Sequence, residues 1–191
     1  MVKEWHDKIY ITDYTKNSSY YYAIGKKCLS NYYSRYGSAF NQKVENTEIE
    51  LNFIIEGYKL RGVIDRLDQP ESGKWVVHDY KTGKNVKSKR QALNDMQLAL
   101  YQIAIEQNYN NINEISLTWH FLQSGSEISI THNREHLKKI EKKIGNNIEK
   151  IVALMDNENN FLPNETLLCN WCYYWEECSA KISRNTAKRA I

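Results

Sequence analysis

Two aspartates and a lysine stand at the ends of neighbouring strand-like segments. Asp65 follows the apolar residues 62–64, and Asp79 and Lys81 close the next apolar segment. Residues two apart in a strand project from the same face, so Asp79 and Lys81 point into one space. Asp65 reaches that space if the two strands pair. The two carboxylates and the backbone carbonyl of Tyr80 would then form a pocket of hard oxygen atoms suited to Mg²⁺ or Mn²⁺.

Such a pocket has a defined chemistry. A divalent ion held there would polarise a phosphodiester and lower the pKa of a bound water molecule. Lys81 would orient that water or offset the negative charge that develops on the phosphate. The alternative interpretation is that these residues are exposed charges at strand ends, because a D-x-K spacing alone is not specific to catalysis.

The elements that must position these residues follow from hydrophobic periodicity. In chain order it predicts a helix over 20–36, strands over 48–56, 59–67 and 75–81, a helix over 90–107, strands over 115–122 and 127–131, and a helix over 134–156. Each of the last two helices is expected to turn one apolar stripe inward: Leu93, Met96, Leu100 and Ile103 in the first, and Leu137, Ile140, Ile144, Ile148, Ile151 and Met155 in the second. The first three strands are expected to form an antiparallel meander. This order predicts one mixed α/β domain over 1–191. Its expected parts are a helical region 1–47, a core 48–131, a helix within 134–158 and a cysteine-containing tail 163–191.

Composition limits the class of protein. The chain has 191 residues, of which 41% are hydrophobic and 26% charged, with a formal net charge of +3. These values are typical of a globular protein and exclude a disordered chain. The sequence contains no apolar run long enough to cross a bilayer and no apolar stretch typical of a signal peptide at its start. We therefore expect a cytoplasmic protein without a membrane partner.

Polar residues on the helix predicted over 90–107 and in the loop before it lie near the pocket in sequence. Gln97 and Tyr101 are one helical turn apart and share a face. Tyr101 could hydrogen-bond a phosphate or stack on a base, and Gln97 could position a phosphate or Lys81. Basic side chains next to Lys81 could follow a phosphate backbone; they are Lys84, Lys87, Lys89 and Arg90. The alternatives are an ordinary helix edge and a solvated loop.

Three of the four cysteines lie within ten residues of one another. Cys169, Cys172 and Cys178 have the spacing C-x2-C-x5-C, which can wrap a tetrahedral Zn²⁺ ion or a [4Fe–4S] cluster. Cys28 is the remaining cysteine and lies alone in the sequence. The alternative is a buried aromatic segment with free thiols.

Three segments in succession resemble the motifs of RecB-like nucleases in the PD-(D/E)XK superfamily. They are G-V-I-D-R-L-D at 62–68, V-V-H-D-Y-K-T-G at 76–83 and Q-L-A-L-Y at 97–101. The resemblance implies a restriction-endonuclease-like core, with a mixed sheet flanked by helices, and metal-dependent cleavage of DNA. It implies metal ligation by Asp65 and Asp79 and a catalytic role for Lys81. It also implies that Gln97 and Tyr101 lie near the active site or the DNA strand.

The resemblance extends to a histidine and to the cysteines. Members of this family supply a histidine metal ligand from a helix before the first strand, which makes His6 the candidate; the other histidines, His78, His120, His132 and His136, are expected to be structural or surface residues. The cysteine triad resembles that of iron–sulfur nucleases of the AddB and CRISPR-adaptation types, whose fourth cysteine lies near the N-terminus. Cys28 departs from that pattern because it follows His6. It is either the fourth ligand or a core residue of the tyrosine-rich helix.

These observations support one leading function and two alternatives. The leading hypothesis is a nuclease, expected to be an exonuclease acting on single strands or DNA ends, in DNA repair, recombination or CRISPR-type DNA processing. The first alternative is a non-catalytic DNA-binding or scaffold module of a helicase–nuclease complex. The second is a zinc-binding interaction module. The expected partners are DNA and a helicase or other DNA-processing subunit.

Overall fold

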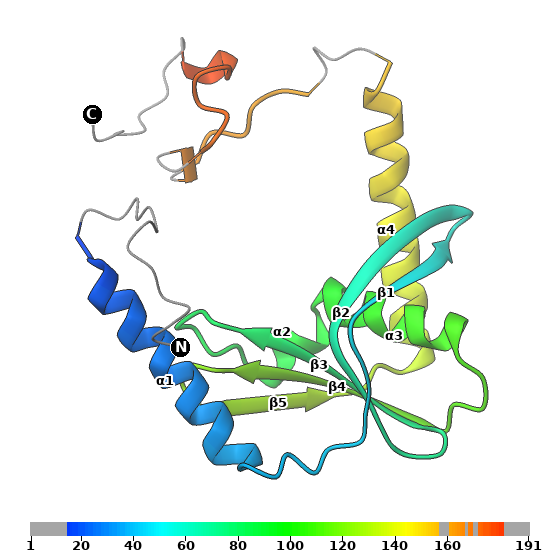
Figure 1. Ribbon diagram of the computed structural model, residues 1–191. Helices are drawn as coiled ribbons and strands as arrows, with labels where there is room; N and C mark the ends of the chain where they lie inside the picture. Colours follow the sequence, from blue (N-terminus) through cyan, green and yellow to red (C-terminus); the bar gives the residue numbers. More distant parts are fainter. Residues whose placement is uncertain (1–14, 157–160, 167, 170–171, 182–191) are drawn as a thin grey trace.

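The computed structural model describes residues 15–156, 161–166, 168–169 and 172–181 (Figure 1). Its elements, in chain order, are α1 (Ser18–Tyr36), β1 (Val44–Ile55), β2 (Tyr58–Glu71), β3 (Lys74–Lys81), α2 (Lys89–Leu93), α3 (Met96–Asn108), β4 (Glu114–Phe121), β5 (Ser126–Ile130), α4 (Arg134–Leu154) and the short 3₁₀ helix η4 (Ser179–Lys181). The predicted alternation of helices and strands is confirmed, with shifts of a few residues at the ends.

The five strands form one mixed sheet in the order β1-β2-β3-β4-β5. β1, β2 and β3 pair antiparallel, which confirms the predicted meander. β4 joins β3 in parallel and β5 returns antiparallel to β4. The chain between β3 and β4 contains α2 and α3, since a parallel connection needs a crossover that spans the sheet.

A tight turn joins the two long strands β1 and β2. Its central residues Glu56 and Gly57 both have positive φ angles, 48° and 81°, which is the geometry of a type I′ hairpin turn. The turn packs against α4, where a Cβ atom on Gly145 would lie 2.7 Å from Cγ of Glu56. The hairpin therefore curves from the sheet to α4, as Figure 1 shows.

The two faces of the sheet differ in chemistry. On one face Val77 of β3 and Leu117 of β4 are fully buried, beside the buried apolar residues of α3 such as Leu98 and Ile105. On the other face the alternate residues are polar, and α1 covers them through long side chains. Asn31, for example, donates to the backbone oxygen of Leu122 at the end of β4. The site predicted from Asp79 and Lys81 lies on the α3 side, because both alternate with His78 and Tyr80.

The helix predicted over 90–107 is two helices. α2 ends at Leu93 and α3 begins at Met96, because the side chain of Asp95 accepts hydrogen bonds from the backbone N–H groups of Gln97 and Leu98 and starts a new helix. The predicted apolar stripe is therefore wrong at its start, where Met96 is 39% exposed.

The long helix α4 begins where Asn133 caps the first turn, as a helix start requires. Leu137, Ile140 and Ile144 are buried against the core, as predicted. The prediction is wrong for the last turns, because Met155 is 68% exposed. Among the residues that the structure describes, no helix is both long and apolar enough to span a membrane.

One buried histidine makes the stability of the fold depend on pH. His132 stacks on His136 with ring centroids 5.0 Å apart, and its ring nitrogens have no hydrogen-bond partner among the described residues. Burial, followed by the nearby His136, lowers the pKa of His132 to about 4. In the unfolded chain His132 binds a proton as the pH falls below about 6.5, whereas in the folded chain it stays neutral to a lower pH. The free energy of unfolding is therefore highest above about pH 6.5 and decreases below it.

We expect the free energy of unfolding to fall by about 2 kcal/mol more in the wild type than in His132→Phe between pH 7 and pH 5. The phenyl ring keeps the stacking surface and cannot titrate. Urea denaturation at the two pH values measures the difference. Equal losses in the two proteins would show that His132 does not carry the effect.

Candidate active site

The two carboxylates predicted as metal ligands lie where the strands β2 and β3 separate. Arg66 of β2 pairs with His78 of β3, and Asp65 and Asp79 come just beyond this pair. The Asp65 side chain still reaches across, since its Oδ2 atom accepts a hydrogen bond of 2.9 Å from the backbone N–H of Tyr80. The structure thus brings Asp65 to the segment that carries Asp79.

Asp79 is almost completely buried, with 2% of its surface exposed. Burial raises the pKa of its carboxyl, the ammonium of Lys81 lowers it, and the negative charges of Asp65 and Asp95 raise it further. The charges of Asp65 and Asp95 thus both act on the carboxyl group of Asp79. Such a concentration of negative charge in a buried place favours the binding of a cation.

A chain of hydrogen bonds holds Lys81. Its Nζ atom lies 2.6 Å from Oδ2 of Asp79 and donates to Oε1 of Gln97 at 2.9 Å. The amide of Gln97 donates in turn to the hydroxyl of Tyr101 at 2.8 Å. Gln97 and Tyr101 therefore share one face of α3, as their spacing predicted, and Gln97 joins Tyr101 to Lys81.

Tyr101 is a neutral phenol. Burial raises the pKa of its hydroxyl to about 12; the hydrogen bond from Gln97 lowers it, and the nearby Asp79 and Asp65 raise it. Because its oxygen accepts from Gln97, its proton remains available for a second acceptor.

Asp95 belongs to this site, although the sequence did not suggest it. Its Oδ1 atom accepts from the backbone N–H groups of Gln97 and Leu98 at 3.0 and 3.3 Å, and its Oδ2 atom lies 3.3 Å from Nζ of Lys87. Asp95 thus fixes the first turn of α3, from which Gln97 reaches Lys81. An aspartate directly before a helical segment is a typical N-cap, and that signal could have identified it.

The basic residues predicted to contact nucleic acid divide into two groups. Lys84, Lys89 and Arg90 are exposed on the loop and on α2. Lys87 instead turns toward the site, where it pairs with Asp95 and lies 4.6 Å from the ring centroid of Trp119. Over the part of the chain that the structure describes, Lys84, Lys89 and Arg90 form no ion pair, so their charges are exposed to a phosphate.

The donor atoms at this place fit a divalent ion of the Mg²⁺ class. The carboxylates of Asp65 and Asp79 and the backbone carbonyl of Tyr80 are all hard oxygen donors. Among the described residues no group of three or more histidine, cysteine, aspartate or glutamate side chains is arranged to hold a metal. The predicted third ligand, His6, lies outside the described residues.

The other histidines are part of the fold. His78 and His120 are buried on the opposite face of the sheet from Asp79, where burial lowers their pKa values to about 3 and about 4. His132 is buried and His136 is half-buried beside it. The prediction that these four are structural or surface residues agrees with their positions.

The structure does not assemble the expected cysteine cluster. No disulfide joins the four described cysteines; Cys28 is 6% exposed in α1, whereas Cys169, Cys172 and Cys178 are half-buried in the C-terminal segment. Over the residues described, the thiols do not converge on a metal position. The spacing of the triad is local, but convergence with Cys28 depends on how the two ends of the chain pack, which spacing cannot predict.

Comparison with known proteins gives the following similarities. A family model of the PD-(D/E)XK nuclease superfamily matches residues 2–179. The structure is similar to the crystal structure of a candidate exonuclease from Eubacterium rectale, with a TM-score of 0.48, 16% identity, and coverage of 100% of this chain and 68% of that one. It is also similar to the protein SSO0001, with a TM-score of 0.46, 22% identity, and coverage of 86% and 75%. No match was found among curated proteins.

Proposed function

The chain belongs to the PD-(D/E)XK nuclease superfamily, and from this premise we propose that it is a Mg²⁺- or Mn²⁺-dependent nuclease that hydrolyses phosphodiester bonds in DNA. The observation that carries the proposal is the placement of Lys81. Its ammonium is held between Asp79 and Gln97, beside the segment that Asp65 contacts. A buried and a half-buried carboxylate next to an oriented lysine form an arrangement suited to phosphodiester hydrolysis.

Each side chain has a role in this mechanism. Asp65, Asp79 and the carbonyl of Tyr80 would hold the divalent ion, which supplies Lewis-acid polarisation of the phosphate when bound. Lys81, oriented by Gln97, places a positive charge where the phosphate gains negative charge. Tyr101 has a free hydroxyl proton with which to bind a phosphate oxygen. His6 remains a candidate further ligand.

We propose that the substrate is a single strand or a DNA end and that the enzyme is an exonuclease of the RecB-like type. The exposed Lys84, Lys89 and Arg90 offer positive charge for the backbone, which is a sequence-independent interaction. Lys87 would join them once a phosphate replaces Asp95 as its partner. We propose that the enzyme acts in the cytoplasm, in DNA repair, recombination or CRISPR-type processing. Its proposed partner is a helicase or other DNA-processing subunit.

The experiment is cleavage of linear and circular single-stranded DNA, and of linear duplex, in the presence of Mn²⁺. An exonuclease degrades the linear strand and leaves the circle intact. Cleavage of the circle would show an endonuclease. Binding of DNA without cleavage of any substrate would contradict the nuclease and favour a DNA-binding or scaffold module.

We also propose that Cys169, Cys172 and Cys178 bind a [4Fe–4S] cluster, with Zn²⁺ as the alternative and Cys28 as the candidate fourth ligand. The support is their spacing and their place on successive turns, where the backbone N–H of Cys172 donates to the carbonyl of Cys169 at 3.3 Å. Since the thiols do not converge, binding requires this segment to close around the metal.

Anaerobic purification tests this centre. We expect a brown protein with broad visible absorbance, and loss of that absorbance in Cys172→Ser. The same loss in Cys28→Ser would assign Cys28 as the fourth ligand. A colourless protein that contains zinc would support the alternative metal, and a protein with neither metal would contradict a metal centre.

A further inference from the structure

A buried arginine lies directly behind the candidate metal site. Arg66 follows Asp65 in β2, projects to the opposite face of the sheet and is 2% exposed. Its Nε and Nη2 atoms pair with the two oxygens of Asp68 at 2.9 and 3.0 Å. Nη2 donates to Oδ2 of Asp68, and this close ion pair compensates the buried charge of Arg66.

The remaining donors of Arg66 reach the residues on both sides of Asp79. Nη1 donates to the hydroxyl of Tyr80 at 2.9 Å, and Nη2 lies 3.0 Å from Nε2 of His78. Arg66 is thus joined by side-chain bonds to the residue before and the residue after Asp79.

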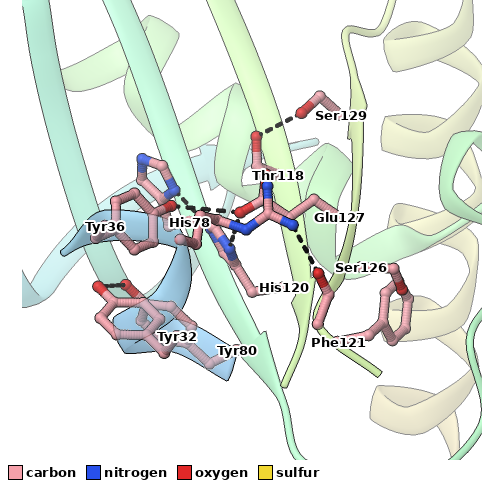
Figure 2. A network of polar contacts seen from close by, with 12 residues as sticks. Tyr32, Tyr36, His78, Tyr80, Thr118, His120, Phe121, Ser126, Glu127 and Ser129 are labelled. Carbon is pink, nitrogen blue, oxygen red and sulfur yellow. Dashed lines mark hydrogen bonds and ion pairs between the residues drawn. The ribbon is translucent and has the colours of Figure 1, made fainter. Parts of the chain in front are cut away.

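A chain of polar contacts joins His78 to Glu127 through His120 (Figure 2). Nδ1 of His120 lies 2.6 Å from Oε1 of Glu127, and Nε2 of His120 lies 2.7 Å from Nδ1 of His78. If His120 donates to Glu127, its Nε2 accepts the proton of Nδ1 of His78. Nε2 of His78 then accepts from Nη2 of Arg66 at 3.0 Å, and it also lies 3.1 Å from Oδ2 of Asp68, which accepts from the same Nη2 atom.

These hydrogen bonds connect β2 and β3 just beyond the last residue pair of their regular strand pairing. The regular pairing of β2 with β3 reaches Arg66 and His78 and does not include Asp65 and Asp79. Beyond it, the backbone N–H of Tyr80 donates to Asp65, and Arg66 donates to the Tyr80 hydroxyl from the other face. The distance between the two carboxylates therefore depends on how Arg66 holds Tyr80 and His78.

We propose that Arg66 is a positioning residue for the divalent ion, which sets the spacing of Asp65 and Asp79 from the opposite face of the sheet. The proposal rests on the proposed function, since it assumes that these carboxylates bind the ion. Residues that orient metal ligands in this way commonly change metal affinity by about tenfold or more when they are replaced.

A matched pair of variants separates positioning from simple support of the fold. Tyr80→Phe and Tyr32→Phe each remove one hydroxyl that accepts from Nη1 of Arg66, at 2.9 and 2.7 Å. Tyr80 belongs to the strand that carries Asp79, whereas Tyr32 belongs to α1. A third variant, Arg66→Lys, keeps the positive charge and removes the planar fork. Arg61→Lys, in the exposed pair with Glu50, is the control on the same strand.

The measurement is direct binding of Mn²⁺ by calorimetry, together with thermal unfolding of each variant. We expect Kd for Mn²⁺ to rise about tenfold in Arg66→Lys and about threefold in Tyr80→Phe, and to stay within about twofold in Tyr32→Phe and Arg61→Lys. Equal shifts in Tyr80→Phe and Tyr32→Phe, or unchanged binding in Tyr80→Phe, would overturn the positioning role. Failure of the wild type to bind Mn²⁺ would instead overturn the proposed function.

Discussion

Asp79→Asn is expected to abolish metal-dependent cleavage while leaving the protein folded. The amide has the shape of the carboxyl but lacks the charge that binds a divalent ion. The rate should therefore fall by about a thousandfold or more. Because burial raises the pKa of Asp79, its charge is costly in the folded protein. The melting temperature of the variant should equal or exceed that of the wild type. Initial cleavage rates at saturating Mn²⁺ and thermal unfolding measure the two effects.

Glu71→Gln is the matched control for this prediction. Glu71 forms an exposed pair with Lys74, far from the site in the strand pairing, so its amide variant should cleave at the wild-type rate. Cleavage by Asp79→Asn within tenfold of the wild type would exclude Asp79 as a metal ligand. A large loss in Glu71→Gln would show that the assay responds to general damage.

Lys81→Met is expected to lower kcat by about a hundredfold to a thousandfold without weakening the binding of Mn²⁺. The methionine keeps the length of the side chain but loses the charge that faces Asp79 at 2.6 Å. Single-turnover cleavage measures the chemical step, and calorimetry measures the metal. Gln97→Ala should give a smaller loss of about tenfold, because Lys81 keeps its contact with Asp79 when the hydrogen bond to Gln97 is lost.

The control is Lys139→Met in α4, where Lys139 pairs with Glu135 on the surface. It removes the same charge and should leave kcat unchanged. If Lys81→Met keeps wild-type kcat, Lys81 does not act in catalysis. If it instead weakens Mn²⁺ binding, the lysine is needed to shape the pocket rather than to stabilise charge on the phosphate.

The geometry of this site was largely predictable because it depends on strand alternation. Asp79 and Lys81 share a face with Val77 for the same reason that any residues two apart do. The one-turn spacing of Gln97 and Tyr101 likewise predicts their shared face. This periodicity depends only on the backbone geometry of a single strand or helix, so the folded protein shows it unchanged.

The features that were missed depend on contacts distant in sequence. The stripe of α4 continues to Met155, but the core does not extend that far, so the last turns stay exposed. Arg66 and Asp68 are charged residues within a strand, and only their pairing explains why they are buried. The role of Asp95 depends on the break between α2 and α3, which interrupts an otherwise continuous apolar pattern.

The most direct test of the central claim is removal and return of the metal in the wild-type protein. With Mn²⁺ present, an end-labelled single-stranded DNA should be cleaved; with a chelator in excess, cleavage should stop; and Mn²⁺ added beyond the chelator should restore it. This result would support an active site built on Asp65, Asp79 and Lys81. Cleavage that continues at the same rate in the chelator, or no cleavage with Mn²⁺ restored, would contradict it.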